Sequence, residues 1–358
     1  MKYQTDDLRI KEIKDLIAPQ DLTSRLPITE AVSECVYNSR LAIKNILHGE
    51  DPRLLVIAGP CSVHDTKAAL EYADRLQPLI EQHKDKLHIV MRVYFEKPRT
   101  TVGWKGLIND PDLDNSFHIN KGVAVARQLL LDLNTKGVSA ATEYLDLISP
   151  QYISDLIAWG AIGARTTESQ THRELASGLS CPVGFKNGTH GNIQIAVDAM
   201  RSASQPHHFF SVTKGGHSAI FSTAGNSDCH IIMRGGGGKT NYDSDSVERA
   251  AALLAKSKQA EKVMIDFSHA NSNKQFEQQR VVAEAVAQQL QAGEQRIMGV
   301  MIESHLVEGR QDLKFNSDGT LDREGLVYGQ SITDACMGWE DTTKVLEILA
   351  SAVQAGPA

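Results

Sequence analysis

The fold is indicated first by one run of residues, His88-Ile-Val-Met91-Arg92-Val-Tyr-Phe-Glu-Lys97-Pro-Arg99-Thr100-Thr-Val-Gly-Trp-Lys105-Gly106. Its apolar start predicts a buried strand, and the proline and glycines that follow exclude a helix or a long strand. Four cationic side chains stand within the fourteen residues from Arg92 to Lys105. Arginine and lysine bind phosphates and carboxylates. The run therefore predicts an anion-binding loop after a buried strand, with a solvated basic loop as the alternative.

The composition limits the class of protein. The chain has 358 residues and a net charge of −7, so these cations are a local concentration in an acidic protein. That balance argues against nucleic acid as the partner and favours a small anionic ligand. Apolar runs of membrane-spanning length and an apolar signal core are both missing from the sequence, so we expect a cytoplasmic protein. The five scattered cysteines indicate reduced thiols rather than a disulfide framework.

Short apolar runs alternate with helical patterns along most of the chain. Eight runs predict strands, which begin near Leu54, His88, Ser139, Ala161, Pro182, His230, Val263 and Met298. The helical patterns that separate and follow them cover 67–83, 116–134, 151–159, 168–178, 191–203, 245–257, 274–291 and 340–354. Eight strands, each followed by a helix, predict an α/β fold of the TIM (β/α)8 barrel type. A doubly wound open sheet is the alternative.

Two parts of the sequence lie outside this pattern. Residues 1–48 predict an N-terminal helical extension for regulation or oligomerisation, with a short helix over 8–17 and an amphipathic helix over 30–48. Residues 49–358 would then form the catalytic barrel. Within that barrel, residues 208–224 predict a β-hairpin inserted between the fifth helix and the sixth strand.

Residues able to do chemistry stand at the ends of the predicted strands, where TIM-barrel enzymes carry their catalytic groups. One set is cationic and consists of Arg92, Lys97, Lys105, Arg165, Lys186 and Arg234. About six positive charges in one place would repel one another unless a multiply charged anion bound among them. We therefore predict a ligand that carries both phosphate and carboxylate.

A second set at the strand ends combines one thiol, one imidazole and two carboxylates, from Cys61, His269, Glu303 and Asp334. Mixed sulfur, nitrogen and oxygen ligands favour a divalent transition metal such as Mn²⁺, Fe²⁺, Co²⁺ or Zn²⁺ over Ca²⁺. From the residues alone, the alternative is a buried cysteine, a core histidine and exposed acids. Cys336, two residues beyond Asp334, could approach Cys61, and oxidation could then join the two thiols.

Five motifs resemble those of type I 3-deoxy-D-arabino-heptulosonate 7-phosphate (DAHP) synthases. They are Ala58-Gly-Pro-Cys61-Ser62, Arg92-Val-Tyr-Phe-Glu-Lys97-Pro-Arg99-Thr100, Gly163-Ala-Arg165-Thr-Thr-Glu-Ser169, Gly184-Phe-Lys186-Asn-Gly188 and Asp266-Phe-Ser-His269-Ala-Asn271. The resemblance covers essentially the whole chain. It implies a TIM barrel that condenses phosphoenolpyruvate with erythrose 4-phosphate in the first step of the shikimate pathway, on the way to chorismate and the aromatic amino acids.

The resemblance also implies roles for individual residues. Cys61, His269, Glu303 and Asp334 would bind a divalent metal, with Mn²⁺ the first choice. The residues around phosphoenolpyruvate would be Arg92, Lys97, Lys105, Glu143, Ala164, Arg165, Lys186 and Arg234, with Asp334 also facing substrate. Erythrose 4-phosphate would meet Lys97, Pro98, Arg99 and Thr100. Cys61, His269 and Lys97 are the predicted catalytic residues, and Lys97 is the first choice for proton transfer, with a purely electrostatic role as the alternative.

The chemistry implied by the resemblance is an aldol-type condensation. Phosphoenolpyruvate attacks the aldehyde carbon through its methylene carbon, water adds at its C2, and the resulting phosphohemiketal releases phosphate. Two rivals are the sister reaction with arabinose 5-phosphate and an inactive phosphosugar-sensing barrel. The run 97–100 favours erythrose 4-phosphate, and the intact metal set argues against an inactive barrel.

Feedback inhibition by an aromatic amino acid is also implied, in a pocket that a neighbouring subunit's arm completes. The matching positions are Asp6, Asp7, Leu147, Pro150, Gln151, Leu179, Ser180, Phe209, Ser211 and Phe221. Ser211 would occupy the space that a phenol hydroxyl needs, so we predict inhibition by phenylalanine, with tyrosine as the alternative. Phe221 is bulkier than the aliphatic residue expected there. The shared pocket predicts a homo-oligomer, a tetramer built as a dimer of dimers.

Overall fold

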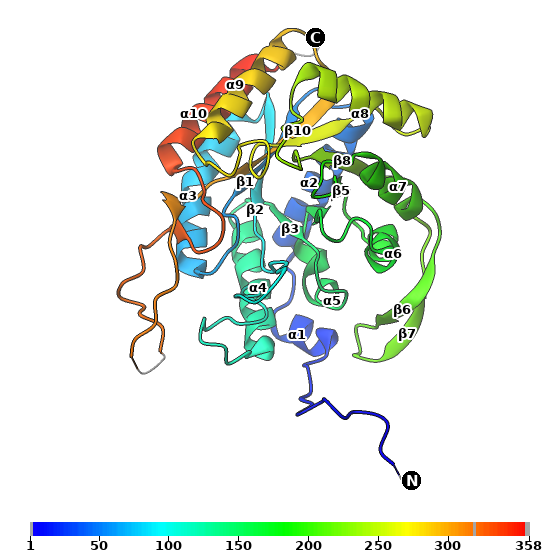
Figure 1. Ribbon diagram of the computed structural model, residues 1–358, viewed down its shortest axis with the longest axis vertical. Helices are drawn as coiled ribbons and strands as arrows, with labels where there is room; N and C mark the ends of the chain where they lie inside the picture. Colours follow the sequence, from blue (N-terminus) through cyan, green and yellow to red (C-terminus); the bar gives the residue numbers. More distant parts are fainter. Residues whose placement is uncertain (1–2, 318–319, 355–358) are drawn as a thin grey trace.

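The computed structural model describes residues 3–317 and 320–354. Eight parallel strands of this part close into a barrel in the order β1-β10-β9-β8-β5-β4-β3-β2 (Figure 1). The strands are β1 (Leu54–Gly59), β2 (Leu87–Arg92), β3 (Ala140–Glu143), β4 (Trp159–Ile162), β5 (Val183–Lys186), β8 (Cys229–Met233), β9 (Val263–Asp266) and β10 (Ile297–Glu303). The closed barrel confirms the predicted fold and excludes the open sheet. The ends of the two predicted domains, residues 1–2 and 355–358, lie outside the described residues.

Every barrel strand begins within two residues of its predicted position. The signal was clear because parallel strands in a barrel are covered on both faces and read as continuous apolar runs. The helices that pack around them are α3 (Thr66–His83), α4 (Ile119–Thr135), α6 (Gln170–Gly178), α7 (Gln194–Ala203), α8 (Ser244–Lys256), α9 (Gln278–Gln291) and α10 (Trp339–Ala352). Side chains cap the start of two of these helices: Asp65 accepts hydrogen bonds from two backbone N–H groups in α3, and Asp243 accepts one from Ser246 N in α8.

Two predicted helices are wrong. The pattern over 151–159 forms only α5 (Pro150–Ile153) and the 3₁₀ turn η1 (Ser154–Leu156), because Trp159 already belongs to β4. Its indole is buried in the barrel, and its Nε1 donates a hydrogen bond to His230 Nε2 at 2.9 Å. The stretch 8–17 is not helical, and the first helix is α1 (Pro19–Arg25). The apolar side chains of 8–17 are largely exposed, so an isolated turn of helix would gain nothing from packing.

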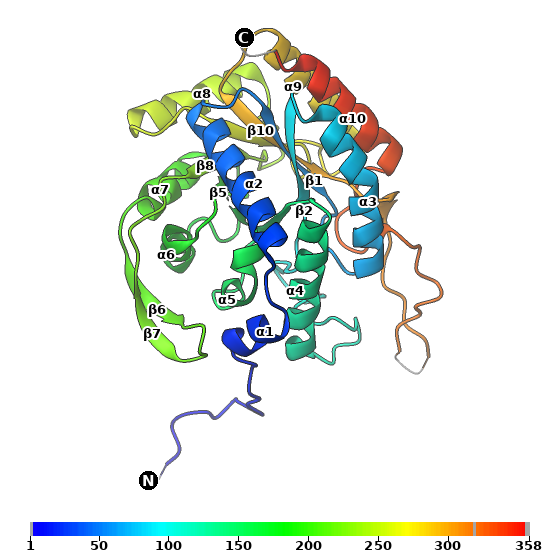
Figure 2. The ribbon, with the colours of Figure 1, turned by 180° about the vertical axis from the view of Figure 1, so that it is seen from behind.

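Helix α2 (Glu30–His48) closes the amino end of the barrel. Figure 2 shows it crossing in front of the strands. Its residues Ile43, Ile46 and Leu47 share a buried cluster with barrel residues such as Leu55. The Ser39 hydroxyl contacts His88 Nε2 at 2.9 Å, at the start of β2. With the amino end covered in this way, the carboxyl ends of the strands are the place for a site, as is usual in this fold.

Two further pairs of strands stand outside the barrel. Strands β6 (His208–Val212) and β7 (Ser218–Ser222) form the predicted hairpin between α7 and β8. Strands β11 (Val307–Arg310) and β12 (Gln330–Ser331) form a small parallel pair after β10, which the sequence did not predict. The hairpin runs along one flank of the molecule, and the N-terminal arm extends away from its body (Figures 1 and 2).

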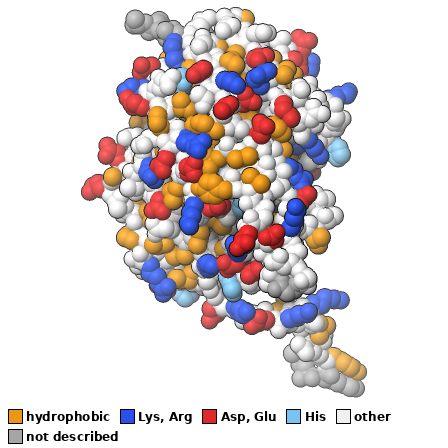
Figure 3. Space-filling model, turned by 90° about the vertical axis from the view of Figure 1, so that its left-hand side faces the viewer, with side chains coloured by type: hydrophobic (Ala, Val, Ile, Leu, Met, Phe, Trp, Pro, Cys, Tyr) orange, Lys and Arg blue, Asp and Glu red, His pale blue; other side chains and the backbone are white. Residues whose placement is uncertain are grey.

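The surface carries charges of both signs. On the face in Figure 3, lysine and arginine side chains lie among aspartates and glutamates, with apolar side chains between them. This mixed face is not the continuous basic surface that a nucleic acid would require. Among the described residues, a helix both long enough and apolar enough to cross a bilayer is not found.

Candidate active site

Three of the four predicted metal ligands meet at the carboxyl ends of the strands. Cys61 follows β1 and Glu303 ends β10, and these two strands are neighbours in the barrel. One ligand atom from each of Cys61, Glu303 and Asp334 lies within 4.8 Å of the other two. Cys61 Sγ and Asp334 Oδ2 are 3.5 Å apart. A thiol and two carboxylates at this spacing fit a divalent transition metal.

His269 borders this cluster. Its Nε2 lies 3.9 Å from Glu303 Oε1, and its Nδ1 lies 2.9 Å from Asp266 Oδ2. A carboxylate on the second ring nitrogen is the usual support for a histidine that binds metal, because it orients the ring. His269 therefore fits the role of fourth ligand from the edge of the cluster. The role of Asp266 was not predicted from the sequence, although its place three residues before His269 in the motif was an available signal.

Lys97 and Arg92 pack directly against the metal cluster. Lys97 Nζ lies 3.1 Å from Cys61 Sγ. Arg92 Nη2 donates to Glu303 Oε1 at 2.8 Å and to the Cys61 carbonyl oxygen at 3.1 Å. Only 1% of Arg92 is exposed, so its guanidinium braces Glu303 in this structure. Its predicted contact with phosphoenolpyruvate stays a prediction.

The charges around the cluster shift the acidities of its members. Burial raises the pKa of Cys61 to about 11, and Glu303 adds to this effect while Lys97 opposes it. For Lys97, burial acts against the charged form, but Cys61, Glu303 and Asp334 together raise its pKa above the ordinary value. Burial also opposes ionisation of Asp334, yet Lys97 and His269 hold its pKa below the usual range. Ionised carboxylates beside the thiol give the cluster the negative charge that a bound cation requires.

The other predicted anion-binding cations extend from this cluster to the surface. Lys186 Nζ lies 2.9 Å from Asp266 Oδ2, and both side chains are buried. Arg234 is half-buried, and burial lowers its pKa, with a further contribution from Arg165 that is partly offset by Asp266. Arg165 is exposed, and its Nη1 lies 3.4 Å from the carbonyl oxygen of Pro98. The structure thus brings Arg165 close to the loop predicted to receive erythrose 4-phosphate, and Arg234 lies near Arg165.

The remaining predicted substrate residues lie on the same end of the barrel. Glu143 ends β3 and is buried, and a side chain on Gly163 would overlap its carboxylate, since a Cβ there would lie 2.2 Å from Glu143 Oε1. Ala164, the next residue, is half-buried. Lys105 is exposed, but its carbonyl oxygen accepts a hydrogen bond from Lys97 N at 2.9 Å. Arg99 and Thr100 are both exposed at the rim.

The predicted inhibitor residues divide between the body of the molecule and the arm. Those of the body lie just before and on α5, after α6 and on the hairpin; they are Leu147, Pro150, Gln151, Leu179, Ser180, Phe209, Ser211 and Phe221. Hydrogen bonds join these elements: Lys214 Nζ donates to the Gln151 carbonyl, and the Ser177 and Thr223 hydroxyls are 2.7 Å apart. The rings of Phe209 and Phe221 lie 6.1 Å apart between centroids. Asp6 and Asp7 are exposed, and their described hydrogen bonds stay within the arm.

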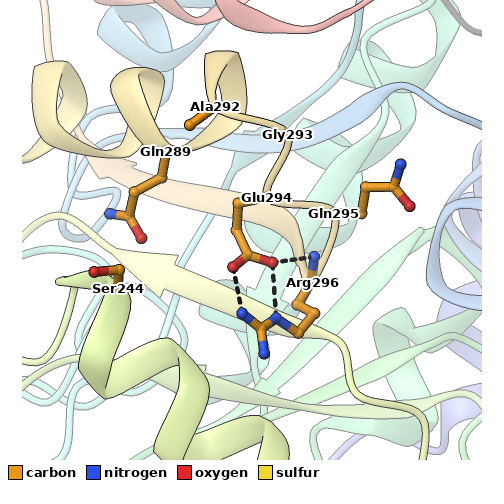
Figure 4. Close-up of a pocket in the computed structure, with 7 residues that line it drawn as sticks. All are labelled: Ser244, Gln289, Ala292, Gly293, Glu294, Gln295 and Arg296. Atoms are coloured by element: carbon orange, nitrogen blue, oxygen red, sulfur yellow. Dashed lines mark hydrogen bonds and ion pairs between the residues drawn. The ribbon is translucent and has the colours of Figure 1, made fainter.

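A surface depression of about 460 Å³ lies at the other end of the barrel, between α9 and β10 (Figure 4). Its charged residues are already paired, since Arg296 Nε donates to Glu294 Oε1 at 2.8 Å. It opens before the start of β10, whereas the metal cluster lies at the end of that strand. This depression is therefore not part of the candidate site.

A closed TIM barrel with buried cations and a thiol–carboxylate cluster at its carboxyl end defines a metal-dependent enzyme that acts on small anionic substrates. The family model described as "DAHP synthetase I family" matches residues 26–347. A relative named "Phospho-2-dehydro-3-deoxyheptonate aldolase, Phe-sensitive" from Escherichia coli is 61% identical over 355 residues, which cover 99% of each chain. A Trp-sensitive relative from the same species is 54% identical over 350 residues, covering 98% of each. The solved structure of a phospho-2-dehydro-3-deoxyheptonate aldolase from Francisella tularensis is 51% identical, with a TM-score of 0.93, and covers 98% of this chain and 100% of that one.

The chain therefore belongs to the DAHP synthetase I family. The resemblance seen in the sequence is confirmed. The enzyme is a metal-dependent transferase that condenses phosphoenolpyruvate with erythrose 4-phosphate in the first step of the shikimate pathway. This match favours the erythrose 4-phosphate reaction over the two rivals, the arabinose 5-phosphate enzyme and the inactive sensor.

Proposed function

We propose that Cys61, His269, Glu303 and Asp334 hold the divalent metal, with Mn²⁺ as the working ion, and that the surrounding cations hold the substrates. The observation that carries this assignment is the contact of three groups: Cys61 Sγ lies 3.5 Å from Asp334 Oδ2 and 3.1 Å from Lys97 Nζ. When bound, the ion would act as a Lewis acid on the aldehyde oxygen of erythrose 4-phosphate. The donor set fits such an ion because it combines a thiol, an imidazole and carboxylates.

The side chains of this chain would do the rest of the chemistry. Arg165, Lys186 and Arg234 would bind the phosphate and carboxylate of phosphoenolpyruvate. Arg99 would meet the phosphate of the aldose at the rim. Holding both substrates in attack geometry offsets much of the entropy lost when two molecules come together. Lys97, between the metal cluster and the rim loop, would transfer the proton at the reacting oxygen, with electrostatic stabilisation of that oxygen as the alternative role.

Activity of purified protein tests this assignment. We expect phosphoenolpyruvate to be consumed when erythrose 4-phosphate is present, and not with arabinose 5-phosphate, because the 97–100 loop is of the type that takes the shorter aldose. Adding Mn²⁺ to chelated enzyme should restore the rate more fully than Fe²⁺, Co²⁺ or Zn²⁺ does. A chelated sample that keeps its full rate would contradict the metal assignment.

We also propose that phenylalanine inhibits this enzyme. The support is the 61% identity with a relative named Phe-sensitive, against 54% with one named Trp-sensitive. The pocket would be formed by α5, the end of α6 and the hairpin, where Phe209 and Phe221 present aromatic rings 6.1 Å apart. A ring would pack against these side chains, and the ligand's ammonium group would meet Asp6 or Asp7.

The arm that carries Asp6 and Asp7 supports a homo-oligomer. It is fixed from Asp15 onward, where Asn120 Nδ2 donates to the Asp15 carbonyl at 3.0 Å and Tyr152 Oη donates to the Ile17 carbonyl at 2.6 Å. Before that point apolar side chains such as Ile13, 80% exposed, face solvent. An arm of this kind suits a neighbouring copy, and we propose a dimer of dimers in which each arm completes its neighbour's pocket.

A titration of phenylalanine, tyrosine and tryptophan tests the inhibitor. We expect phenylalanine to inhibit the full chain at the lowest concentration, and a variant that lacks residues 1–15 to lose that inhibition and keep its activity. Equal inhibition of the truncated variant, or no effect of phenylalanine or tyrosine on the full chain, would refute this proposal. Light scattering of the same two proteins measures the oligomeric state.

A further inference from the structure

Gln279 lies beside the metal cluster, and neither the sequence motifs nor the substrate contacts account for it. It is the second residue of α9 and is completely buried. Its Nε2 donates to the carbonyl oxygen of Glu303 at 2.8 Å, and its Oε1 accepts a hydrogen bond from Glu303 N at 2.9 Å. One side-chain amide therefore binds both backbone polar groups of a single residue, and that residue is a proposed metal ligand.

The N–H of Glu303 needs this partner because a neighbouring strand has ended, whereas its carbonyl oxygen also accepts a hydrogen bond from Met337 N at 2.9 Å. The last pair of residues between β10 and β9 is Met301 with Asp266, so β10 continues for two residues beyond it. After Asp266 the chain leaves the sheet, and His269 adopts a left-handed conformation with φ of 60°. On the opposite side β10 stays paired with β1 as far as Gly59 and Glu303. An unpaired buried N–H is costly, and Gln279 occupies the place of the missing strand.

The side chain of Glu303 is held by different groups. Arg92 Nη2 donates to Oε1 at 2.8 Å, and Ser268 Oγ donates to Oε2 at 2.9 Å. These contacts orient the carboxylate. Its position also depends on the position of the Glu303 backbone. The carboxylate of Glu303 is completely buried.

We propose that Gln279 is a positioning residue for the metal site: by binding both backbone groups of Glu303, it holds that carboxylate in the geometry that receives the ion. This inference rests on the proposed role of Glu303 as a metal ligand. Removing a group that supports a metal ligand weakens metal binding about 10–100-fold. Gln279 should therefore affect the affinity for metal much more than it affects the rest of the fold.

The experiment compares Mn²⁺ binding by three variants of the full chain. Gln279→Met removes both hydrogen bonds at nearly constant length, and Gln279→Glu keeps the acceptor for Glu303 N. The control is Gln289→Met, on the same helix, where a half-buried amide donates to the Tyr242 carbonyl at 2.9 Å. Electron paramagnetic resonance of free Mn²⁺ measures binding to chelator-treated protein without substrate, and the melting temperature of each metal-free protein is recorded alongside.

We expect Gln279→Met to raise the Kd for Mn²⁺ by about 10–100-fold, Gln279→Glu to raise it less, and Gln289→Met to leave it within about twofold of wild type. Wild-type affinity in Gln279→Met would overturn the proposal. So would an equal loss in Gln289→Met, because loosening of α9 as a whole would then explain the effect. If Gln279→Met fails to fold, the comparison of Gln279→Glu with the control decides. A wild-type protein that binds no Mn²⁺ would refute the metal site itself, and this inference with it.

Discussion

Replacing Asp266 with asparagine removes a negative charge from the interior of the barrel and keeps the shape of the side chain. Asp266 is completely buried, and its Oδ2 lies 2.9 Å from both Lys186 Nζ and His269 Nδ1. Its Oδ1 accepts a hydrogen bond from Ser268 N at 3.0 Å. The Asp266→Asn variant would leave the Lys186 ammonium group buried without its counter-charge.

The expected loss of stability follows from that geometry. Removing one partner of a buried ion pair costs about 3–5 kcal/mol, because the other charge stays out of water. An unfolding entropy of about 2.1 cal/mol/K per residue gives about 0.75 kcal/mol/K for this chain of 358 residues. The melting temperature of Asp266→Asn should therefore fall by about 4–7 °C. The same change frees the His269 ring, so the affinity for Mn²⁺ should fall by about tenfold or more.

Calorimetry of the metal-free protein at neutral pH measures the first effect, and Mn²⁺ titration measures the second. The matched control is Asp74→Asn, which breaks a lysine–aspartate pair at the surface, where Lys136 Nζ lies 2.6 Å from Asp74 Oδ1. An exposed pair contributes about 0–1 kcal/mol, so this control should melt within about 1 °C of wild type. The reasoning is refuted if Asp266→Asn melts as close to wild type as the control does.

Three further predictions concern the thiols and the inhibitor pocket. Cys61→Ala should abolish Mn²⁺ binding and activity while circular dichroism stays unchanged, because only one ligand is removed; bound Mn²⁺ in this variant would contradict the assignment. Treatment with hydrogen peroxide should join Cys61 to Cys336, whose Sγ lies 3.3 Å from Cys61 N, and inactivate the enzyme; mass spectrometry of an inactive sample without this linkage would exclude the disulfide. Ser211→Gly should make the enzyme more sensitive to tyrosine, because it frees space for a phenol hydroxyl; an unchanged ratio of tyrosine to phenylalanine inhibition would count against this pocket.

The fold could be predicted from the sequence where strands are completely buried. The prediction failed where a local helical pattern did not match the tertiary structure. Strands β1 and β10 are buried along their whole length, and their continuous apolar runs therefore predicted strands correctly. The stretch 151–159 has a helical pattern, but its last residue, Trp159, is the first residue of barrel strand β4. In the arm, the spacing of Ile and Leu over 8–17 suggested a helix, although the described structure offers that segment no surface to pack against.

The site residues that could be predicted from the sequence are those at strand ends, because the topology of the barrel brings the carboxyl ends of the strands together. Cys61 and Glu303 are far apart in sequence, yet they follow neighbouring strands, and their ligand atoms lie in one cluster. Gln279 could not have been found in this way. In sequence it is one polar residue among several in an amphipathic helix, and only the early end of β9 gives it a partner.

The six predicted cations of the site do not all carry an unpaired charge. Two of them are neutralised inside the protein, since Arg92 pairs with Glu303 and Lys186 with Asp266. Among the ion pairs of residues 3–317 and 320–354, none includes Lys97, Lys105, Arg165 or Arg234, which leaves these four charges for ligands. A phosphate carries about −1.5 to −2 charges at neutral pH, and a carboxylate adds one more. The four unpaired cations therefore exceed the charge of one phosphoenolpyruvate by about one. Arg92 braces Glu303, and Lys186, whose charge is already balanced by Asp266, would bind that substrate without adding net charge.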